Sequence, residues 1–134
     1  MTLKIIISRS PNLFVFAQKK KAQPALRELQ GYINKTERSE TLFFGRNKKA
    51  VLNRWHFAIG SEHKRRFKKA FDDADTFFNS HWGKTEDHLH KWKKYFEEND
   101  YVVRQAFLCI EKACGLEKFN YKNVPIYLIS VPGK

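Results

Sequence analysis

The sequence predicts a mostly helical α+β fold of about five helices, with a small sheet that pairs the two ends of the chain. Between residues 24 and 114, apolar residues recur at the three- and four-residue spacing of amphipathic helices. Two short apolar runs, residues 3–7 and 124–129, lie at opposite ends of the chain and read as partner strands. A chain of 134 residues without a long linker is expected to form one domain, residues 1–134.

Residues 101–130 are expected to form the centre of the core. A helix with Val103, Phe107 and Ile110 on one face is followed by Gly115, a residue suited to end a helix. The apolar strand then comes after a short turn. Its residues 126–129 show no polar alternation, so both faces of the strand are expected to be buried.

The first third of the chain contains one clear helix signal. Residues 8–12 combine serine, proline and asparagine and predict a turn, after which residues 13–17 return to the core. Pro24 is placed as the first residue of a helix whose apolar face carries Leu26, Leu29 and Ile33. Residues 34–41 are polar and predict a loop, and the apolar residues 42–45 receive no assignment.

Three further helices are predicted in the middle of the chain. Residues 47–59 and 62–79 show helical spacing, and the break between them is Gly60. A turn is expected at residues 79–84, around Gly83, before Thr85 caps a helix with the stripe Leu89, Trp92 and Phe96. Twelve phenylalanines in the chain predict an aromatic-rich core.

Positive charge is concentrated in the first half of the chain. Residues 1–71 contain 17 Lys and Arg and 4 Asp and Glu, a balance of +13, whereas residues 72–134 contain 9 and 10, a balance of −1. Such an asymmetry concerns binding partners rather than the fold. It predicts a non-enzymatic basic domain that binds nucleic acid or another polyanion through residues 46–69.

The expected binding residues come from two neighbouring helices. Phe57 lies opposite Trp55 on its helix, so it is either buried by another element or exposed, where its ring could stack on a base. A solvated lysine-rich surface without a ligand would explain the same composition. The residues assigned to nucleic-acid binding are Lys48, Lys49, Arg54, Phe57, Lys64, Arg65, Lys68 and Lys69.

Histidine spacing provides an alternative, a small metal-dependent hydrolase. His81 and His88 could meet across the predicted turn, although a third ligand would have to be assumed. His88 and His90 diverge by about 200° on a helix and cannot share one ion. The sequence contains no zinc-protease, nucleophile-elbow or glycine-rich phosphate-loop motif, so neither a catalytic residue nor a cofactor is assigned.

The positions of the cysteines and the hydropathy of the chain indicate the cellular compartment in which the protein is expected. Cys109 and Cys114 point about 140° apart on the predicted helix, which excludes a disulfide between them. Two buried thiols fit a reducing compartment, and no apolar run approaches the roughly 20 residues of a membrane span. A cytoplasmic location without a membrane partner is therefore expected.

Segments near both ends of the chain resemble a known protein family. Residues 107–115 (Phe-Leu-Cys-Ile-Glu-Lys-Ala-Cys-Gly), followed by the strand 124–129, resemble the region before the active-site helix of zincin-like metallopeptidases. Residues 10–13 (Ser-Pro-Asn-Leu) after a first strand are similar to the start of some such proteins. The resemblance implies a front part or truncated relative without the His-Glu-x-x-His zinc motif, and therefore without peptidase activity. It assigns no ligand or base to any residue here.

Overall fold

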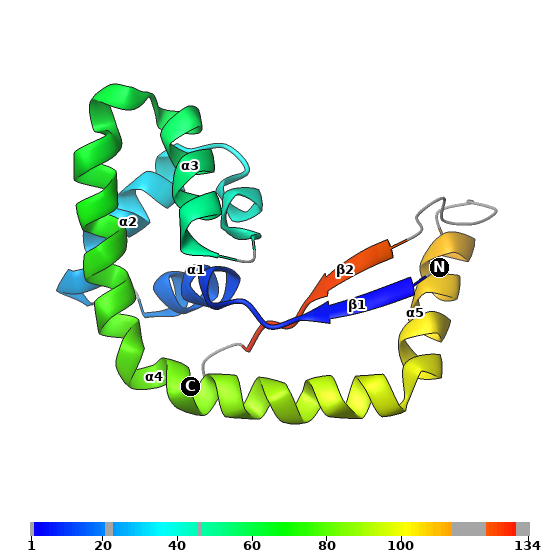
Figure 1. The fold of residues 1–134 in the computed structure, drawn as a ribbon. Helices are drawn as coiled ribbons and strands as arrows, with labels where there is room; N and C mark the ends of the chain where they lie inside the picture. The colour runs from blue at the N-terminus through cyan, green and yellow to red at the C-terminus, as the bar shows by residue number, and fades with distance from the viewer. Residues whose placement is uncertain (1, 21–22, 46, 114–122, 131–134) are drawn as a thin grey trace.

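A computed structural model describes residues 2–20, 23–45, 47–113 and 123–130. It confirms the mostly helical α+β fold with a two-stranded sheet formed by the chain ends (Figure 1). The elements in chain order are β1 (Thr2–Ile6), α1 (Arg9–Lys19), α2 (Pro24–Lys35), the 3₁₀ helix η1 (Ser39–Phe43), α3 (Lys48–Ile59), the 3₁₀ helix η2 (Ser61–His63), α4 (Lys64–Glu98), α5 (Asp100–Ala113) and β2 (Asn123–Tyr127).

The hydrophobic core lies in a lobe formed by α1, α2, η1, α3 and the first half of α4. Its centre is aromatic, as predicted. The Trp55 ring stacks on Phe67 with ring centroids 4.7 Å apart, and Phe43 meets Trp55 edge-on at 5.5 Å. Such pairs add to the stabilisation that burial of the rings already provides. Phe43, which the sequence left unassigned, is fully buried because η1 turns it inward.

The turn predicted at residues 8–12 is wrong, because α1 begins at Arg9. Pro11 is tolerated in the first helical turn, where backbone N–H groups have no intrahelical acceptor. The Arg9 guanidinium fixes this end of the helix to α4: its Nε donates to Asp75 Oδ1 at 2.7 Å, and its Nη2 donates to the Asp75 carbonyl at 2.6 Å. The contact between Arg9 and Asp75, which are 66 residues apart, thus stabilises the start of α1, where the residue types favour a turn.

Helices α2 and α3 follow the sequence prediction closely. Helix α2 starts at Pro24 and buries Leu26, Leu29 and Ile33, the predicted face, against α4. At the start of α3, the Asn47 side chain accepts a hydrogen bond from the Ala50 N–H at 2.9 Å. This cap satisfies one of the free donors of the first turn.

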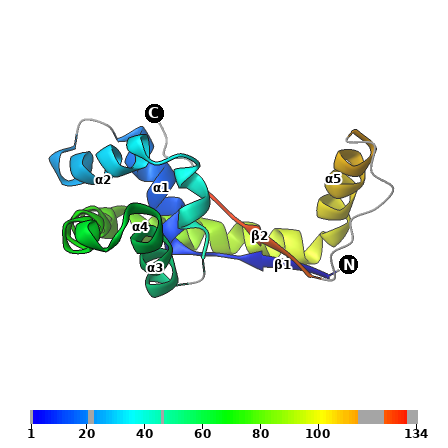
Figure 2. The same cartoon turned by 90° about the horizontal axis from the view of Figure 1, so that it is seen from above.

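Helix α4 is continuous through residues 79–84, so the turn predicted there is also wrong. The helix instead bends near its middle, and its second half runs beneath the sheet (Figures 1 and 2). Ser80 Oγ donates to the Phe77 carbonyl and Thr85 Oγ1 to the His81 carbonyl, at 3.2 and 2.9 Å. Side-chain hydrogen bonds of this kind bend helices, and Gly83 lies between them.

The sheet contains two parallel strands, with Ile5 aligned to Ile126 and Ile6 to Tyr127. The Leu128 N–H donates to the Ile6 carbonyl at 3.1 Å, so the amides of even-numbered residues in β2 point toward β1. Pro125 therefore faces the open edge, where its missing N–H interrupts no ladder hydrogen bond. This placement explains how a proline fits within the strand.

The described residues between 101 and 130 do not form the centre of the core. Helix α5 contains no buried residue among residues 100–113, and its main packing partner is the end of α4. In β2 and just after it, Pro125 and Ile129 are exposed, so the expectation that both faces of the strand are buried is also wrong. The predicted end of α5 at Gly115 lies outside the described residues. Apolar sequence alone did not distinguish a core element from an outlying one.

Candidate nucleic-acid interface

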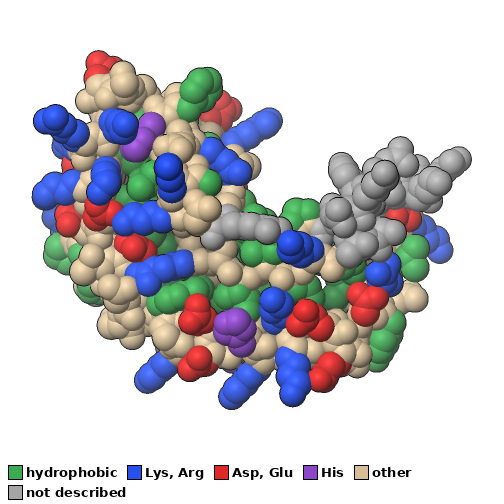
Figure 3. Space-filling view, viewed as in Figure 1, with side chains coloured by type: hydrophobic (Ala, Val, Ile, Leu, Met, Phe, Trp, Pro, Cys, Tyr) green, Lys and Arg blue, Asp and Glu red, His purple; other side chains and the backbone are tan. Residues whose placement is uncertain are grey.

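The predicted binding residues come from α3 and from the start of α4, which η2 connects. The inner face of α3 is occupied by Val51, Leu52 and Trp55, all buried. Of the charged side chains of α3, Lys48 reaches α4 and pairs with Asp72, whereas Lys49 and Arg54 are exposed. Figure 3 shows lysine and arginine side chains distributed over this lobe, with acidic side chains between some of them.

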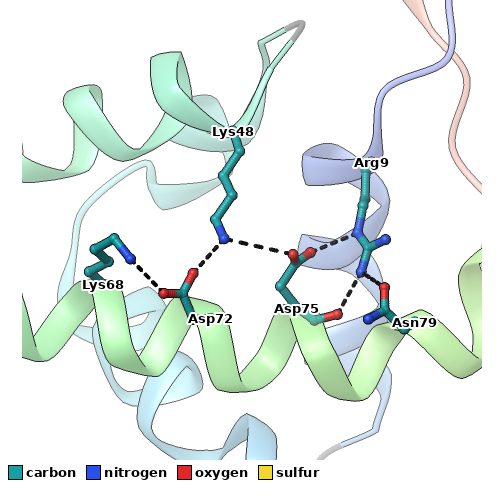
Figure 4. Close-up of polar contacts among 6 residues, drawn as sticks. All are labelled: Arg9, Lys48, Lys68, Asp72, Asp75 and Asn79. Atoms are coloured by element: carbon teal, nitrogen blue, oxygen red, sulfur yellow. Dashed lines mark hydrogen bonds and ion pairs between the residues drawn. The ribbon is translucent and has the colours of Figure 1, made fainter.

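Three of the predicted cationic residues are neutralised by aspartates of α4. Lys48 forms an ion pair with Asp72, and its Nζ lies 3.9 Å from Asp75 Oδ2. Lys68 Nζ also contacts Asp72, at 2.8 Å from Oδ2, and Lys69 pairs with Asp73 at 3.7 Å. Figure 4 shows the resulting network, which joins α3, α4 and the start of α1 through Arg9, Lys48, Lys68, Asp72, Asp75 and Asn79.

The pKa of Asp72 reports the strength of this network. Partial burial by itself would raise the pKa of the carboxyl group. Hydrogen bonds from Lys48 and Lys68, together with their charges, outweigh that effect and hold the pKa of Asp72 below its ordinary value. Lys48 and Lys68 therefore face a carboxylate that is ionised at neutral pH, in contacts that are themselves exposed.

Other predicted cationic residues keep their charge available. Lys49, Lys64 and Arg65 are exposed and form no ion pair within the described part of the chain. The Arg54 guanidinium donates a hydrogen bond to the Phe44 carbonyl, which orients the group without neutralising it. These four residues form the cationic part of the candidate interface.

Phe57 is the most exposed large apolar side chain that the structure describes. Its exposed fraction is 94%, which decides between the two alternatives that its helical position allowed. It lies three residues after Arg54 and eight after Lys49, with Asn53 between them, so helical geometry places these side chains on neighbouring positions of one face. Exposure of a phenyl ring costs hydrophobic stabilisation that burial would provide.

Lys64 approaches the end of α3 from the start of α4. The pKa of His56 is lowered, first by burial of the imidazole and second by the positive charge of Lys64. The Nε2 atom of His56 is buried without a hydrogen-bond partner among the described residues.

The two histidines considered as metal ligands make other contacts. His81 packs against the Phe16 ring with centroids 4.8 Å apart, and His88 Nε2 accepts a hydrogen bond from Trp92 Nε1 at 3.1 Å. The turn across which they were expected to meet is replaced by continuous helix. Within the described residues, no group of three His, Cys, Asp or Glu side chains is placed to hold a metal ion.

Cys109 is exposed on α5, contrary to the expectation of a buried thiol, because this helix lies outside the core. Cys114 lies outside the described residues. None of the described helices combines the length and the apolar composition that a bilayer span requires.

The ion pairs of α4 show why the charge asymmetry overstated the basic surface. The boundary at residue 71 separates Lys48 and Lys68 from Asp72, the residue that neutralises both. Lys68–Asp72 and Lys69–Asp73 are four residues apart on one helix, and this spacing is a local signal for ion pairs. The Lys48 contacts, in contrast, depend on the packing of α3 against α4.

Comparison of the chain with models of protein families, with curated proteins and with solved structures finds no match. The resemblance to the front region of zincin-like metallopeptidases therefore stays a hypothesis, and the candidate interface rests on the chain's own geometry.

Proposed function

We propose that this protein binds single-stranded nucleic acid through Lys49, Arg54, Phe57, Lys64 and Arg65, which we call the Phe57 surface. The observation that carries the proposal is the 94% exposed ring of Phe57, which projects from a helix face that also bears unneutralised cations. Aromatic side chains next to basic residues bind single strands by stacking on bases while the cations contact phosphates. Double strands offer no unstacked base to such a ring.

The number of cations that are not paired with an aspartate predicts how strongly binding depends on salt. Each phosphate contact to a single strand contributes roughly −0.7 to the slope of log affinity against log salt concentration. Four available cations therefore predict a slope of about −3. If the neutralised residues Lys48, Lys68 and Lys69 also bound phosphates, seven contacts would give about −5.

The test is a fluorescence-polarisation titration of labelled oligouridine and oligothymidine across a range of salt concentrations. We expect salt-sensitive binding to single strands and weaker binding to a duplex of equal length. The slope of log affinity against log salt concentration should be about −3, the value for four contacts. Phe57→Ala is expected to weaken affinity at least about fivefold, because stacking is worth ~1–3 kcal/mol per base. Absence of salt-sensitive binding would leave a solvated basic surface and refute the proposal.

A matched control removes a different exposed ring. Tyr101 on α5 has an exposed fraction of 65% and lies outside the lobe that carries the Phe57 surface. Tyr101→Ala is expected to leave affinity unchanged. Equal losses from Phe57→Ala and Tyr101→Ala would show that the ring of Phe57 has no specific role.

A further inference from the structure

A pocket lies between α2, the end of α3 and the start of α4, next to the Phe57 surface. Its volume is about 650 Å³. Protein pockets that bind small organic groups have volumes of ~300–1,000 Å³. Ala58, Ile59, His63 and Arg66 line this pocket, and each lies one or two positions in the chain from a member of the Phe57 surface. A strand held by the Phe57 surface would therefore pass close to the pocket.

Gly31 leaves the α2 side of the pocket without a side chain. It lies inside helix α2, where glycine costs ~0.5–1 kcal/mol relative to alanine. A Cβ at this position would meet no atom within 4 Å, so the packing of the fold does not require glycine here. Glycine also serves where a ligand approaches the backbone closely, and Gly31 lines the pocket. This position therefore points to an occupant that lies against α2.

The apolar part of the pocket wall is held in place by the core. Tyr32 meets the buried Phe67 ring edge-on, with ring centroids 5.2 Å apart. Ile59 is likewise partly buried against the core, and both side chains line the pocket. A ring that is fixed in this way can stack on a planar group with little loss of side-chain entropy.

The polar part of the wall is electrically balanced. Glu28 and Glu37 provide two negative charges, and Lys35 and Arg66 provide two positive charges. Arg66 Nε donates to Glu28 Oε1 at 2.6 Å, which uses only one of the five donors of the guanidinium group. The charges therefore favour a neutral group over a phosphate or a cation, and the wall offers it both hydrogen-bond donors and acceptors.

We propose that this pocket binds one nucleobase of the single strand that the Phe57 surface holds, and that it gives binding a base preference. A nucleobase is planar and neutral, and its edge carries donors and acceptors together. Stacking on Phe57 alone tolerates any base, whereas fixed polar groups at a base edge distinguish between bases. The inference rests on the proposed function, because the strand brings the base to the pocket.

The test compares short labelled strands of uridine, cytidine or adenosine, equal in length and charge, by fluorescence polarisation. We expect the affinities of the best and the worst strand to differ at least about tenfold. A base that fails to match a charged group forfeits a hydrogen bond worth ~1.5–3 kcal/mol. The slope of log affinity against log salt concentration should be the same for all three strands, because their phosphates make the same contacts.

Gly31→Leu fills the pocket from α2 without disturbing other contacts. It is expected to reduce the ratio of best to worst affinity at least about fivefold, while the salt slope stays at about −3. Gly83→Leu is the matched control, because Gly83 is also a helical glycine with open surroundings but does not line the pocket. Leucine favours helix over glycine, so both variants should unfold at or above the wild-type temperature.

A second variant fills the pocket from α3. Ala58 is exposed, so Ala58→Leu is expected to preserve the fold and to reduce the base preference as Gly31→Leu does. Equal affinity of the wild-type protein for all strands would overturn the inference, as would a preference that neither variant reduces. In both cases salt-sensitive binding would leave the proposed function intact. Absence of salt-sensitive binding to every strand would refute the proposed function and this inference together.

Discussion

Asn12 joins the start of α1 to Leu128, a residue 116 positions away in the sequence. The Asn12 Nδ2 group donates to the Leu128 carbonyl at 3.1 Å and to the Ser8 carbonyl at 2.9 Å, while Oδ1 accepts from the Ser130 N–H at 2.8 Å. One side chain thus uses both its donor and its acceptor groups to hold the end of the sheet against the helical lobe. Asn12 itself is only 1% exposed; its bond to Ser8 is buried, and its bonds to Leu128 and Ser130 are part-buried.

Substitution of this asparagine is expected to destabilise the fold strongly. Asn12→Leu keeps a similar size but removes three hydrogen bonds and takes the partner from part-buried backbone groups of Leu128 and Ser130. We expect a loss of about 2–4 kcal/mol in the free energy of unfolding, measured by urea denaturation. Asn53→Leu, on the exposed face of α3, is the control and should change stability by less than about 0.5 kcal/mol. A loss below about 1 kcal/mol for Asn12→Leu would show that these three hydrogen bonds contribute little to stability.

Asp72 is expected to limit the affinity for nucleic acid. Asp72→Asn removes the carboxylate that neutralises Lys48 and Lys68, so both side chains become more available to phosphates. We expect tighter binding at low salt and a salt slope steeper by up to about 1.4, which is two contacts at roughly 0.7 each. Asp87→Asn changes the net charge equally but lies in the second half of α4. Identical effects of the two variants would mean that only net charge matters.

Stability is expected to fall as the pH decreases below about 6.5, the ordinary value for histidine. The pKa of His56 is lowered in the folded protein, so the unfolded chain binds a proton more readily and acid favours unfolding. Thermal unfolding between about pH 7.5 and 5.5 measures this effect. His56→Gln should reduce the pH dependence in that range, whereas His90→Gln at an exposed position should not. A profile unchanged by His56→Gln would contradict this assignment.

A second decrease is expected below about pH 4, where Asp72 acts in the same direction. Its pKa is lowered in the folded protein, so its contribution is present above the ordinary carboxyl value and is lost as the folded carboxylate is protonated. Asp72→Asn should remove this part of the acid transition, and Asp87→Asn should retain it. An acid transition that is unaffected by Asp72→Asn would show that the ion pairs with Lys48 and Lys68 contribute little to stability.

Two glycines are expected to respond to alanine in opposite directions. Gly83 lies within α4, and a Cβ there would meet nothing within 4 Å, so Gly83→Ala should stabilise the protein by about 0.5–1 kcal/mol. Gly60 has φ 91° and ψ 153°, a conformation essentially restricted to glycine. Gly60→Ala should therefore destabilise by ~1–3 kcal/mol. Thermal unfolding of both variants checks the signs, and a loss for Gly83→Ala would show that the bend in α4 requires glycine.

The sequence predicted elements whose signals are local and failed where distant contacts decide. Helix α2 was predictable because Pro24 and the spacing of Leu26, Leu29 and Ile33 lie within one segment. Helix α4 was divided at Gly83 because turn-forming residues cluster there, whereas burial of Phe78 before the bend and Leu89 after it favours continuous helix. Tertiary packing here overrides local propensity.

The candidate sites likewise combine features that local sequence predicts with features that depend on distant contacts. Helical periodicity placed Phe57 opposite the core, but only the folded chain shows that nothing covers it. The small pocket where the first turns of α1 and α3 meet the side of α4 was not predicted at all. It depends on the meeting of α1 and α3 and on the Ser8–Gly45 hydrogen bond, which spans 37 residues. No sequence motif records such a meeting, so no local pattern could have revealed it.

The pairing of Thr2 with Asn123 affects how the protein is made. The strand at the start of the chain is synthesised 121 residues before its partner, which at ~5–20 residues per second amounts to roughly 6–24 seconds on the ribosome. During that interval Leu3, Ile5 and Ile6 have no neighbouring strand and are available to chaperones or to nascent chains nearby. Newly made molecules are thus expected to expose this apolar strand until β2 emerges from the ribosome.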